Sequence, residues 1–217
     1  MAKISWGILD GFIGKVGTVI GSFWKGKPVM RAYKRQVRDR ESEAQLLVRT
    51  RFGAINSLAG AFLSAIRIGF AEVARRKRTT EGNVFVQENW SFVHADTPGS
   101  ATVDFSELKI AKGSLPEVEF GSPKFDTPLT VEVPIAAGDV PIGADSSDLV
   151  FMFVYSPEAG QGLLSEAVTR GDESVVLTVP GYWNGHRVHL WGFAVGGGHD
   201  DAGVISNSRY LGSGDIS

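Results

Sequence analysis

Residues 21–27, GSFWKGK, have the glycine and lysine spacing of a phosphate-binding loop, and they follow a candidate strand, as such a loop requires. The chemistry expected there is nucleotide binding and hydrolysis. The segment fails the other requirements, because Pro28 stands where a magnesium-binding hydroxyl is needed, and Phe23 and Trp24 fill positions of the loop. We therefore interpret it as the aromatic turn of a β-hairpin.

Histidine offers no clearer chemistry. The chain has four, His94, His186, His189 and His199. Only His186 and His189 are close in sequence, and a separation of three places them on opposite faces of a strand, so they cannot chelate one ion. The carboxylates of 200–201 lack the ligand spacing of a calcium loop. The absence of cysteine also removes disulfides, thiolate zinc sites and cysteine nucleophiles. Because each of these templates fails, we expect no metal, no cofactor, no small-molecule substrate and no enzymatic activity.

Charge is divided unevenly along the chain. Residues 1–80 carry 16 Lys and Arg against 5 Asp and Glu, whereas residues 81–217 carry 6 against 19. Such asymmetry indicates either a polyanion partner or the docking of one copy's basic end on another copy's acidic end. We prefer a homo-oligomer, with nucleic acid as the alternative partner, because only assembly also uses the apolar N-terminal segment. The assembly interface predicted from these residues consists of Trp6, Phe12, Phe23, Trp24, Lys25, Lys27, Arg31, Arg35 and Arg38.

The first 40 residues are expected to form a glycine- and aromatic-rich hairpin and a basic arm. Six glycines between residues 7 and 26 disfavour a helix, at a cost of about 1 kcal/mol each relative to alanine. Residues 15–24 and 28–33 are the expected strands, with Pro28 opening the second strand, where a missing N–H is tolerated. The segment lacks the features of a signal peptide or a membrane span, so the expected location is the cytoplasm or an assembled particle such as a virion.

Residues 41–78 have the clearest helical period and are predicted to form one long helix. One row of mostly large apolar residues and a second row of mostly small residues each recur in steps of four and three. The two rows lie on adjacent sides of the predicted helix. The predicted packing residues are Gly53 and Gly60, where another backbone can come close, and Phe62 and Ile66 on the apolar side.

After residue 78 the pattern changes to short alternating segments. Residues 79–99 are expected to be a connector with short strands, and residues 100–217 an immunoglobulin- or fibronectin-like antiparallel β-sandwich. The predicted strands are 83–86, 90–93, 102–110, 117–120, 129–134, 149–155, 174–179, 187–195 and 204–211. The fold class is thus α+β, with a hairpin, one long helix and a sandwich.

Several short motifs occur in an order that resembles a known family. They are GKVG at 14–17, WKGK at 24–27, IGF at 68–70, VDFS at 103–106 followed by GSL at 113–115, and SNSRYLG at 206–212. Together they resemble an uncharacterised domain-of-unknown-function family of Bacteroidota bacteria and their mobile elements and phages. This family has no assigned activity, so the resemblance implies an architecture and no catalytic residues.

The function predicted from the sequence is a self-assembling structural protein, such as a virion, tail or filament subunit, acting through its N-terminal hairpin and basic arm. Two alternatives remain open. The basic half is also suited to nucleic acid, and the sandwich could bind a ligand or surface through Tyr182, Trp183 and Trp191. Whether assembly gives a ring or a filament is not determined by the sequence.

Overall fold

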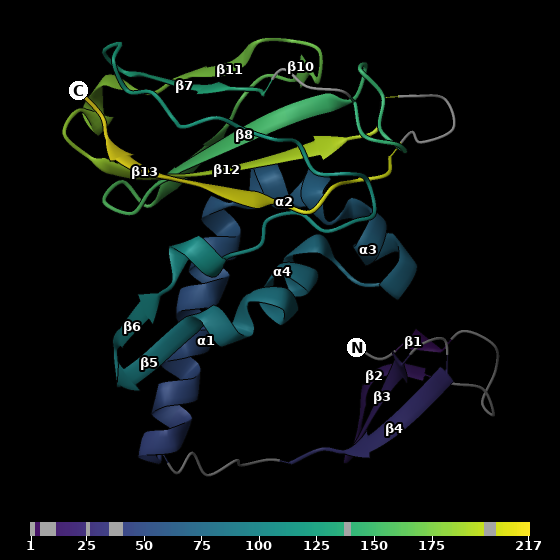
Figure 1. Cartoon of the computed structure of the whole chain (residues 1–217). Helices are drawn as coiled ribbons and strands as arrows, with labels where there is room; N and C mark the ends of the chain where they lie inside the picture. Colours follow the sequence, from purple (N-terminus) through teal and green to yellow (C-terminus); the bar gives the residue numbers. More distant parts are fainter. Residues whose placement is uncertain (1–2, 5–11, 25–26, 35–40, 137–139, 198–202) are drawn as a thin grey trace. The chain divides into compact units, whose positions relative to one another are not determined.

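The computed structural model describes residues 3–4, 12–24, 27–34, 41–136, 140–197 and 203–217 (Figure 1). The chain divides into two compact units, residues 1–42 and residues 43–217. In their described residues, the first unit contains only strands, and the second contains helices and strands. The structure is therefore α+β with several antiparallel sheets, as the sequence predicts.

The N-terminal unit is a four-stranded antiparallel sheet in the order β1-β2-β3-β4. Its strands are β1 (Lys3–Ile4), β2 (Phe12–Val16), β3 (Val19–Trp24) and β4 (Lys27–Ala32). The predicted hairpin is present as β3 and β4, whose last pair is Trp24 and Lys27. The continuous strand expected over 15–24 is wrong, because residues 17–18 form a turn that Gly17 permits with a φ of +57°. Pro28 lies in β4, an edge strand of the sheet.

The single helix expected over residues 41–78 is also wrong. The segment forms α1 (Glu43–Ala61), α2 (Leu63–Gly69) and α3 (Ala71–Lys77), and α1 and α2 are bent by 83°. No proline lies at the bend, which falls at Phe62. Because the Phe62 ring is fully buried, 4.7 Å from the ring of Phe153 in β8 (Leu149–Ser156), we attribute the bend to packing on the sheet.

Helix α4 (Glu81–Asn89) replaces the strand expected over 83–86 and takes up the first part of the connector expected over 79–99, whose second part does contain a short strand at Val93–Thr97. Thr80 caps it, because its hydroxyl accepts a hydrogen bond from the Asn83 N–H at 3.3 Å. Val84 and Phe85 are fully buried in the helical layer. Their strand-favouring side chains are therefore used to pack one helix against others.

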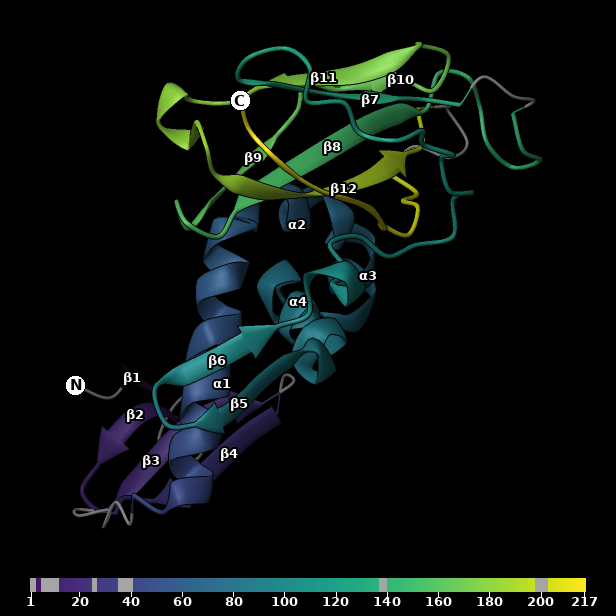
Figure 2. The ribbon, with the colours of Figure 1, turned by 60° about the vertical axis from the view of Figure 1, so that its left-hand side comes forward.

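The described strands of the C-terminal unit form three antiparallel sheets, one of five strands and two of two strands. The remaining strands are β5 (Val93–Thr97), β6 (Ser100–Val103), β7 (Thr130–Pro134), β9 (Gln161–Leu164), β10 (Val168–Thr169), β11 (Ser174–Thr178), β12 (Arg187–Val195) and β13 (Arg209–Asp215). One sheet has the order β10-β8-β12-β13, with β9 also on β8, and another pairs β11 with β7. Figures 1 and 2 show the β7–β11 pair on one side of this larger sheet and the helices on the other.

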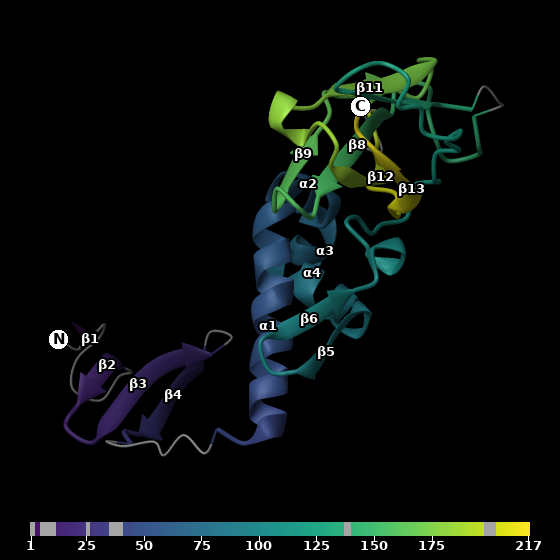
Figure 3. The same ribbon diagram turned by 90° about the vertical axis from the view of Figure 1, so that its left-hand side faces the viewer.

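Two apolar cores fill the two sides of the larger sheet. One lies between the sheets and includes Val133, Met152 and Leu190. The other joins the sheet to the helices and includes Phe62 and Trp191. The central strand β8 is thus covered on both faces, which explains its nearly continuous apolar sequence. Figure 3 shows α1 extending from the sandwich alongside β5 and β6.

Four predicted strands are confirmed almost residue by residue, namely 129–134 as β7, 149–155 as β8, 174–179 as β11 and 187–195 as β12. The strand expected over 117–120 is wrong, since only Phe120 forms an isolated bridge, to Ile135. The strand expected over 90–93 is mostly a short 3-10 helix, Trp90–Phe92. The strand expected over 102–110 ends at Val103, and the one expected over 204–211 begins only at Arg209.

No single helix in the described part of the chain is long and apolar enough to cross a membrane. Helices α1 and α2 reach that length and composition only when joined across their bend.

Candidate functional site

The N-terminal sheet has no core of its own among the residues whose burial is described. Gly21 is the one buried residue there, and no large apolar side chain is buried. A small sheet gains independent stability only by burying an apolar face. The two faces of this sheet are therefore the first place to look for function.

One face of the sheet carries no charged residue among those that the structure describes. Paired residues of adjacent strands share a face, and successive residues of a strand alternate between faces. By this register the uncharged face consists of Phe12, Gly14, Val16, Val19, Gly21, Phe23, Pro28, Met30 and Ala32. We name it the apolar face. Val16 is 52% exposed, Phe23 46% and Met30 70%, so its largest side chains remain open to a partner.

A close contact organises the apolar face. The side chain and backbone of Phe12 in β2 lie over Gly21 in β3, and a Cβ at residue 21 would stand 2.7 Å from the Phe12 ring. Real Cβ atoms do not approach that closely. The missing side chain of Gly21 thus leaves the space that Phe12 occupies on the apolar face.

The opposite face combines cations with apolar and aromatic groups. It consists of Ile13, Lys15, Ile20, Ser22, Trp24, Lys27, Val29 and Arg31. We name it the basic face. Its Lys15 ammonium lies 3.6 Å from the centre of the Tyr33 ring, a cation–π contact, and Trp24 is exposed beside Lys27 at the end of the hairpin.

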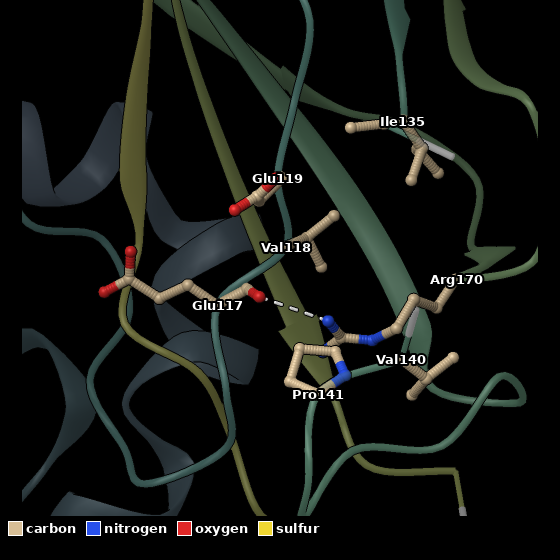
Figure 4. Close-up of a pocket in the computed structure, with 8 residues that line it drawn as sticks. Glu117, Val118, Glu119, Ile135, Val140, Pro141 and Arg170 are labelled. Carbon is tan, nitrogen blue, oxygen red and sulfur yellow. Dashed lines mark hydrogen bonds between the residues drawn. The ribbon is translucent and has the colours of Figure 1, made fainter. Parts of the chain in front are cut away.

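A pocket of about 230 Å³ lies in the C-terminal unit (Figure 4). Its lining residues are Glu117, Val118, Glu119, Ile135, Ala136, Val140, Pro141 and Arg170. Val118 and Ile135 are buried and form an apolar floor, whereas Glu117 and Glu119 are exposed. In Figure 4 both carboxylates lie on the side of their segment away from Val140. In the described residues, neither carboxylate has a cationic partner.

Arg170 is a structural part of this pocket. Its Nε lies 3.3 Å from Asp148 Oδ2, and both side chains are almost fully buried. The guanidinium also donates hydrogen bonds to the carbonyl oxygens of Pro116, at 2.8 Å, and Glu117, at 3.1 Å. Because Asp148 neutralises Arg170, the local charge of the pocket comes from Glu117 and Glu119.

The profile of a family of unknown function, DUF6266, matches residues 11–212. The chain belongs to DUF6266. No curated protein matches the DUF6266 chain. A solved structure, the fn3 domain of the human collagen alpha-1(XX) chain, aligns with 49% of the DUF6266 chain and 89% of its own, at 15% identity and a TM-score of 0.31. These comparisons attach no activity to the DUF6266 chain.

The residues predicted to form one assembly interface lie on two faces of the DUF6266 sheet. Phe12 and Phe23 are on the apolar face, and Trp24, Lys27 and Arg31 are on the basic face. The other four, Trp6, Lys25, Arg35 and Arg38, lie outside the described residues. Sequence reasoning missed Val16 and Met30, which the alternation along the hairpin could have placed beside Phe23.

The four helix residues predicted to pack closely fall into two groups, two that are buried and two that are exposed. Phe62 and Ile66 are fully buried against the sheet. Gly53 and Gly60 are exposed, and a Cβ at either would meet nothing within 4 Å in the described chain, so a close approach at these glycines stays a prediction that concerns a partner. Within the chain, a close approach occurs at Gly69, where a Cβ would stand 2.7 Å from that of Ala111.

A serine and a histidine in the DUF6266 chain lie within hydrogen-bond distance. Ser156 Oγ is 3.1 Å from Nδ1 of His186, and Glu158 Oε2 is 3.6 Å from the same nitrogen. A nucleophilic triad needs the serine and the carboxylate on opposite ring nitrogens. Ser156 is also fully buried and accepts a hydrogen bond from the Ala159 N–H at 3.2 Å. The cluster therefore closes the turn after β8.

His189 is likewise held by its neighbours. Its Nδ1 lies 2.8 Å from the Tyr210 hydroxyl, and Phe105 stacks on the ring at 4.3 Å. Burial, and then the charge of Arg187, lowers the pKa of His189. Among the residues the structure describes, no three His, Asp or Glu residues are grouped to hold a metal ion, and the segment 198–202 lies outside them.

The aromatic platform expected on the sandwich is wrong for two of its three residues. Trp183 and Trp191 are fully buried, and Trp191 donates a hydrogen bond to the Leu108 carbonyl oxygen at 3.1 Å. Only Tyr182 is exposed, and its hydroxyl lies 2.6 Å from Gln161 Oε1.

Proposed function

We propose that this protein is a non-enzymatic structural subunit that assembles with copies of itself through the apolar face of its N-terminal sheet. The observation that carries the proposal is the uncharged face, which leaves Val16, Phe23 and Met30 about half exposed or more. Burying one such side chain completely contributes roughly 1.5–3 kcal/mol relative to full exposure. The sheet therefore gains stability when a second apolar surface covers this face.

The apolar face of a second copy of the protein is a suitable partner for this face. The apolar face has no charged member, so two copies can meet without burying a charge or opposing like charges. Lys15, Lys27 and Arg31 would then stand on the two outer surfaces. Two sheets that pack face to face are a common arrangement for strands with one apolar face, and an interface between identical patches closes as a pair.

The non-enzymatic part of the proposal is supported by how the chain uses its reactive groups. The segment resembling a phosphate-binding loop contributes strand β3 and the first residue of β4, whereas a phosphate-binding loop leads into a helix. Ser156 and His186 stabilise a turn. The virion, tail or filament type of subunit, and an origin in Bacteroidota or their phages, remain predictions from the sequence.

Light scattering during size-exclusion chromatography tests the proposal on the full chain at about 1 M salt, where contacts between surface charges are screened. We expect twice the chain mass of 23.3 kDa. Replacing Phe23→Gln and Met30→Gln together should give a single chain. The matched control, Leu63→Gln with Val176→Gln, removes two exposed apolar side chains from the C-terminal unit and should remain paired.

A wild-type monomer at every protein concentration would reject the proposal. So would a double Phe23→Gln, Met30→Gln variant that still pairs as tightly as the wild type.

A further inference from the structure

We infer that Trp24 and Lys27, which pair at the end of the hairpin on the basic face, dock into the acidic-rimmed pocket of a second copy. This inference rests on the proposed function and adds a second contact to it. Pairing through the apolar face uses one side of the N-terminal sheet, and the pocket contact uses the other. The two surfaces can therefore act at the same time.

The pocket has the size and chemistry to receive one side chain. Its volume of about 230 Å³ is below the roughly 300–1,000 Å³ of sites that bind free small molecules. Val118, Ile135 and Val140 supply apolar walls. Since Arg170 is already paired with Asp148, the two free carboxylates of Glu117 and Glu119 give the pocket's surroundings a negative charge.

The end of the hairpin has the complementary chemistry. Trp24 is 68% exposed, and its direct partner across the strands, Lys27, is on the same face. An indole can enter an apolar pocket while a neighbouring lysine such as Lys27, whose long stem reaches past the ring, meets carboxylates outside.

The charges of the two units favour a second copy over a nucleic acid as the occupant. Residues 1–42 carry nine Lys and Arg against three Asp and Glu, whereas residues 43–217 carry thirteen against twenty-one. A polyanion drawn to the basic face would be repelled by the acidic remainder of each chain. Another copy's acidic pocket is attracted to the same face.

A contact between unlike patches continues from copy to copy unless its geometry closes into a ring. Combined with pairing through the apolar face, it would link pairs into larger assemblies. Because this contact joins opposite charges at the surface, it should weaken as the screening length falls from about 10 Å at 0.1 M salt to about 3 Å at 1 M.

Sedimentation velocity of the full chain, at low salt and at about 1 M salt, tests the inference. The wild type should form species larger than a pair at low salt and fall to a pair at high salt. The variant Glu117→Gln with Glu119→Gln should remain a pair at both. The matched control, Glu107→Gln with Glu166→Gln, removes the same charge from two other exposed sites and should behave as the wild type.

A charge exchange gives a second, independent readout. Lys27→Glu alone and Glu119→Lys alone should each lose the larger species, and an equimolar mixture of the two variants should recover part of it. Recovery occurs because the mixture supplies two complementary contacts: the altered hairpin of one variant meets the altered pocket of the other, and the unaltered hairpin of the second meets the unaltered pocket of the first.

The outcomes separate the two proposals. A wild type that is a pair at both salts rejects the pocket contact and leaves apolar pairing intact, whereas a monomer at both rejects the proposed function as well. Larger species that disappear with nuclease, and return with added single-stranded DNA, would assign the basic face to nucleic acid and overturn the inference. Unchanged assembly in the Glu117→Gln, Glu119→Gln variant would also overturn it.

Discussion

Phe12 lies over Gly21 so closely that any Cβ at residue 21 would collide with it. This contact packs β2 against β3 on the apolar face of the N-terminal sheet. Gly21 therefore differs from glycines such as Gly53, where a Cβ would face open space.

Gly21→Ala should disrupt the N-terminal sheet, because Phe12 must move to admit the methyl group. We expect faster hydrogen exchange in β2 and β3 and loss of the paired species in light scattering. Gly53→Ala is the matched control, since its methyl group would meet no atom in α1 or beyond. It should stabilise the helix by roughly 0.5–1 kcal/mol and leave pairing unchanged. Equal exchange in wild type and Gly21→Ala would contradict this reading.

Phe62→Ala should destabilise the C-terminal unit by about 3–5 kcal/mol, the usual cost of removing a buried aromatic ring. Its ring contacts those of Phe153 and Tyr155, with centroids 4.7 and 4.8 Å away. Urea unfolding followed by circular dichroism measures the change. Leu63→Ala, one residue along and 40% exposed, should cost far less. Similar losses for the two variants would show that the bend at Phe62 is not anchored by its burial.

Asp148→Asn should cost about 3–5 kcal/mol, because it leaves the buried charge of Arg170 without its counter-charge. The loss should appear in urea unfolding and as faster hydrogen exchange in residues 116–119, which Arg170 holds through two carbonyl oxygens. Asp126→Asn, at an exposed site, is the control and should change neither. An Asp148→Asn variant as stable as the wild type would mean that the pair contributes little.

His189 should make the C-terminal unit less stable in mild acid. Burial, followed by the charge of Arg187, lowers its folded-state pKa below the ordinary 6.5, so the unfolded chain binds more protons. The contribution of His189 to the free energy of unfolding is therefore complete above pH 6.5. It declines as the pH falls through 6.5 and stops declining below the folded-state pKa.

Urea unfolding at several pH values between about 7.5 and 5 checks this, with His189→Gln as the comparison. The variant should lose less stability on acidification than the wild type, because Gln does not titrate. An equal or larger loss in the variant would assign the acid sensitivity to other groups.

The sequence predicted β8 and β12 most accurately, because their strong local patterns agree with their final packing. β8 and β12 lie at the centre of the larger sheet, so their long apolar runs correspond closely to buried strands. The segment 83–86 misled the prediction because Val84 and Phe85 favour strands, whereas Thr80 caps a helix there. The bend at Phe62 has no local signal, because it depends on rings contributed by distant strands.

The candidate site was predictable in its composition and not in its arrangement. Aromatic and basic residues near the hairpin indicate an interface, but their types alone do not divide them between two surfaces. Only the pairing of Trp24 with Lys27, and of Gly21 with Met30, shows that the charged residues share one face and leave the other face uncharged. The pocket was missed because the segments around Glu117, Ile135 and Arg170 meet only in the folded chain.

Cross-linking between copies at neighbouring residues of β4 tests the central claim most directly. The chain has no cysteine, so Met30→Cys places a single thiol on the apolar face and Val29→Cys places one on the basic face. A bifunctional thiol reagent no longer than about 10 Å, the usual spacing of packed sheets, should join two chains of the Met30→Cys variant at about 1 M salt. It should leave the Val29→Cys variant as single chains. Equal cross-linking of both variants, or none with Met30→Cys while the protein is still paired, would contradict assembly through the apolar face.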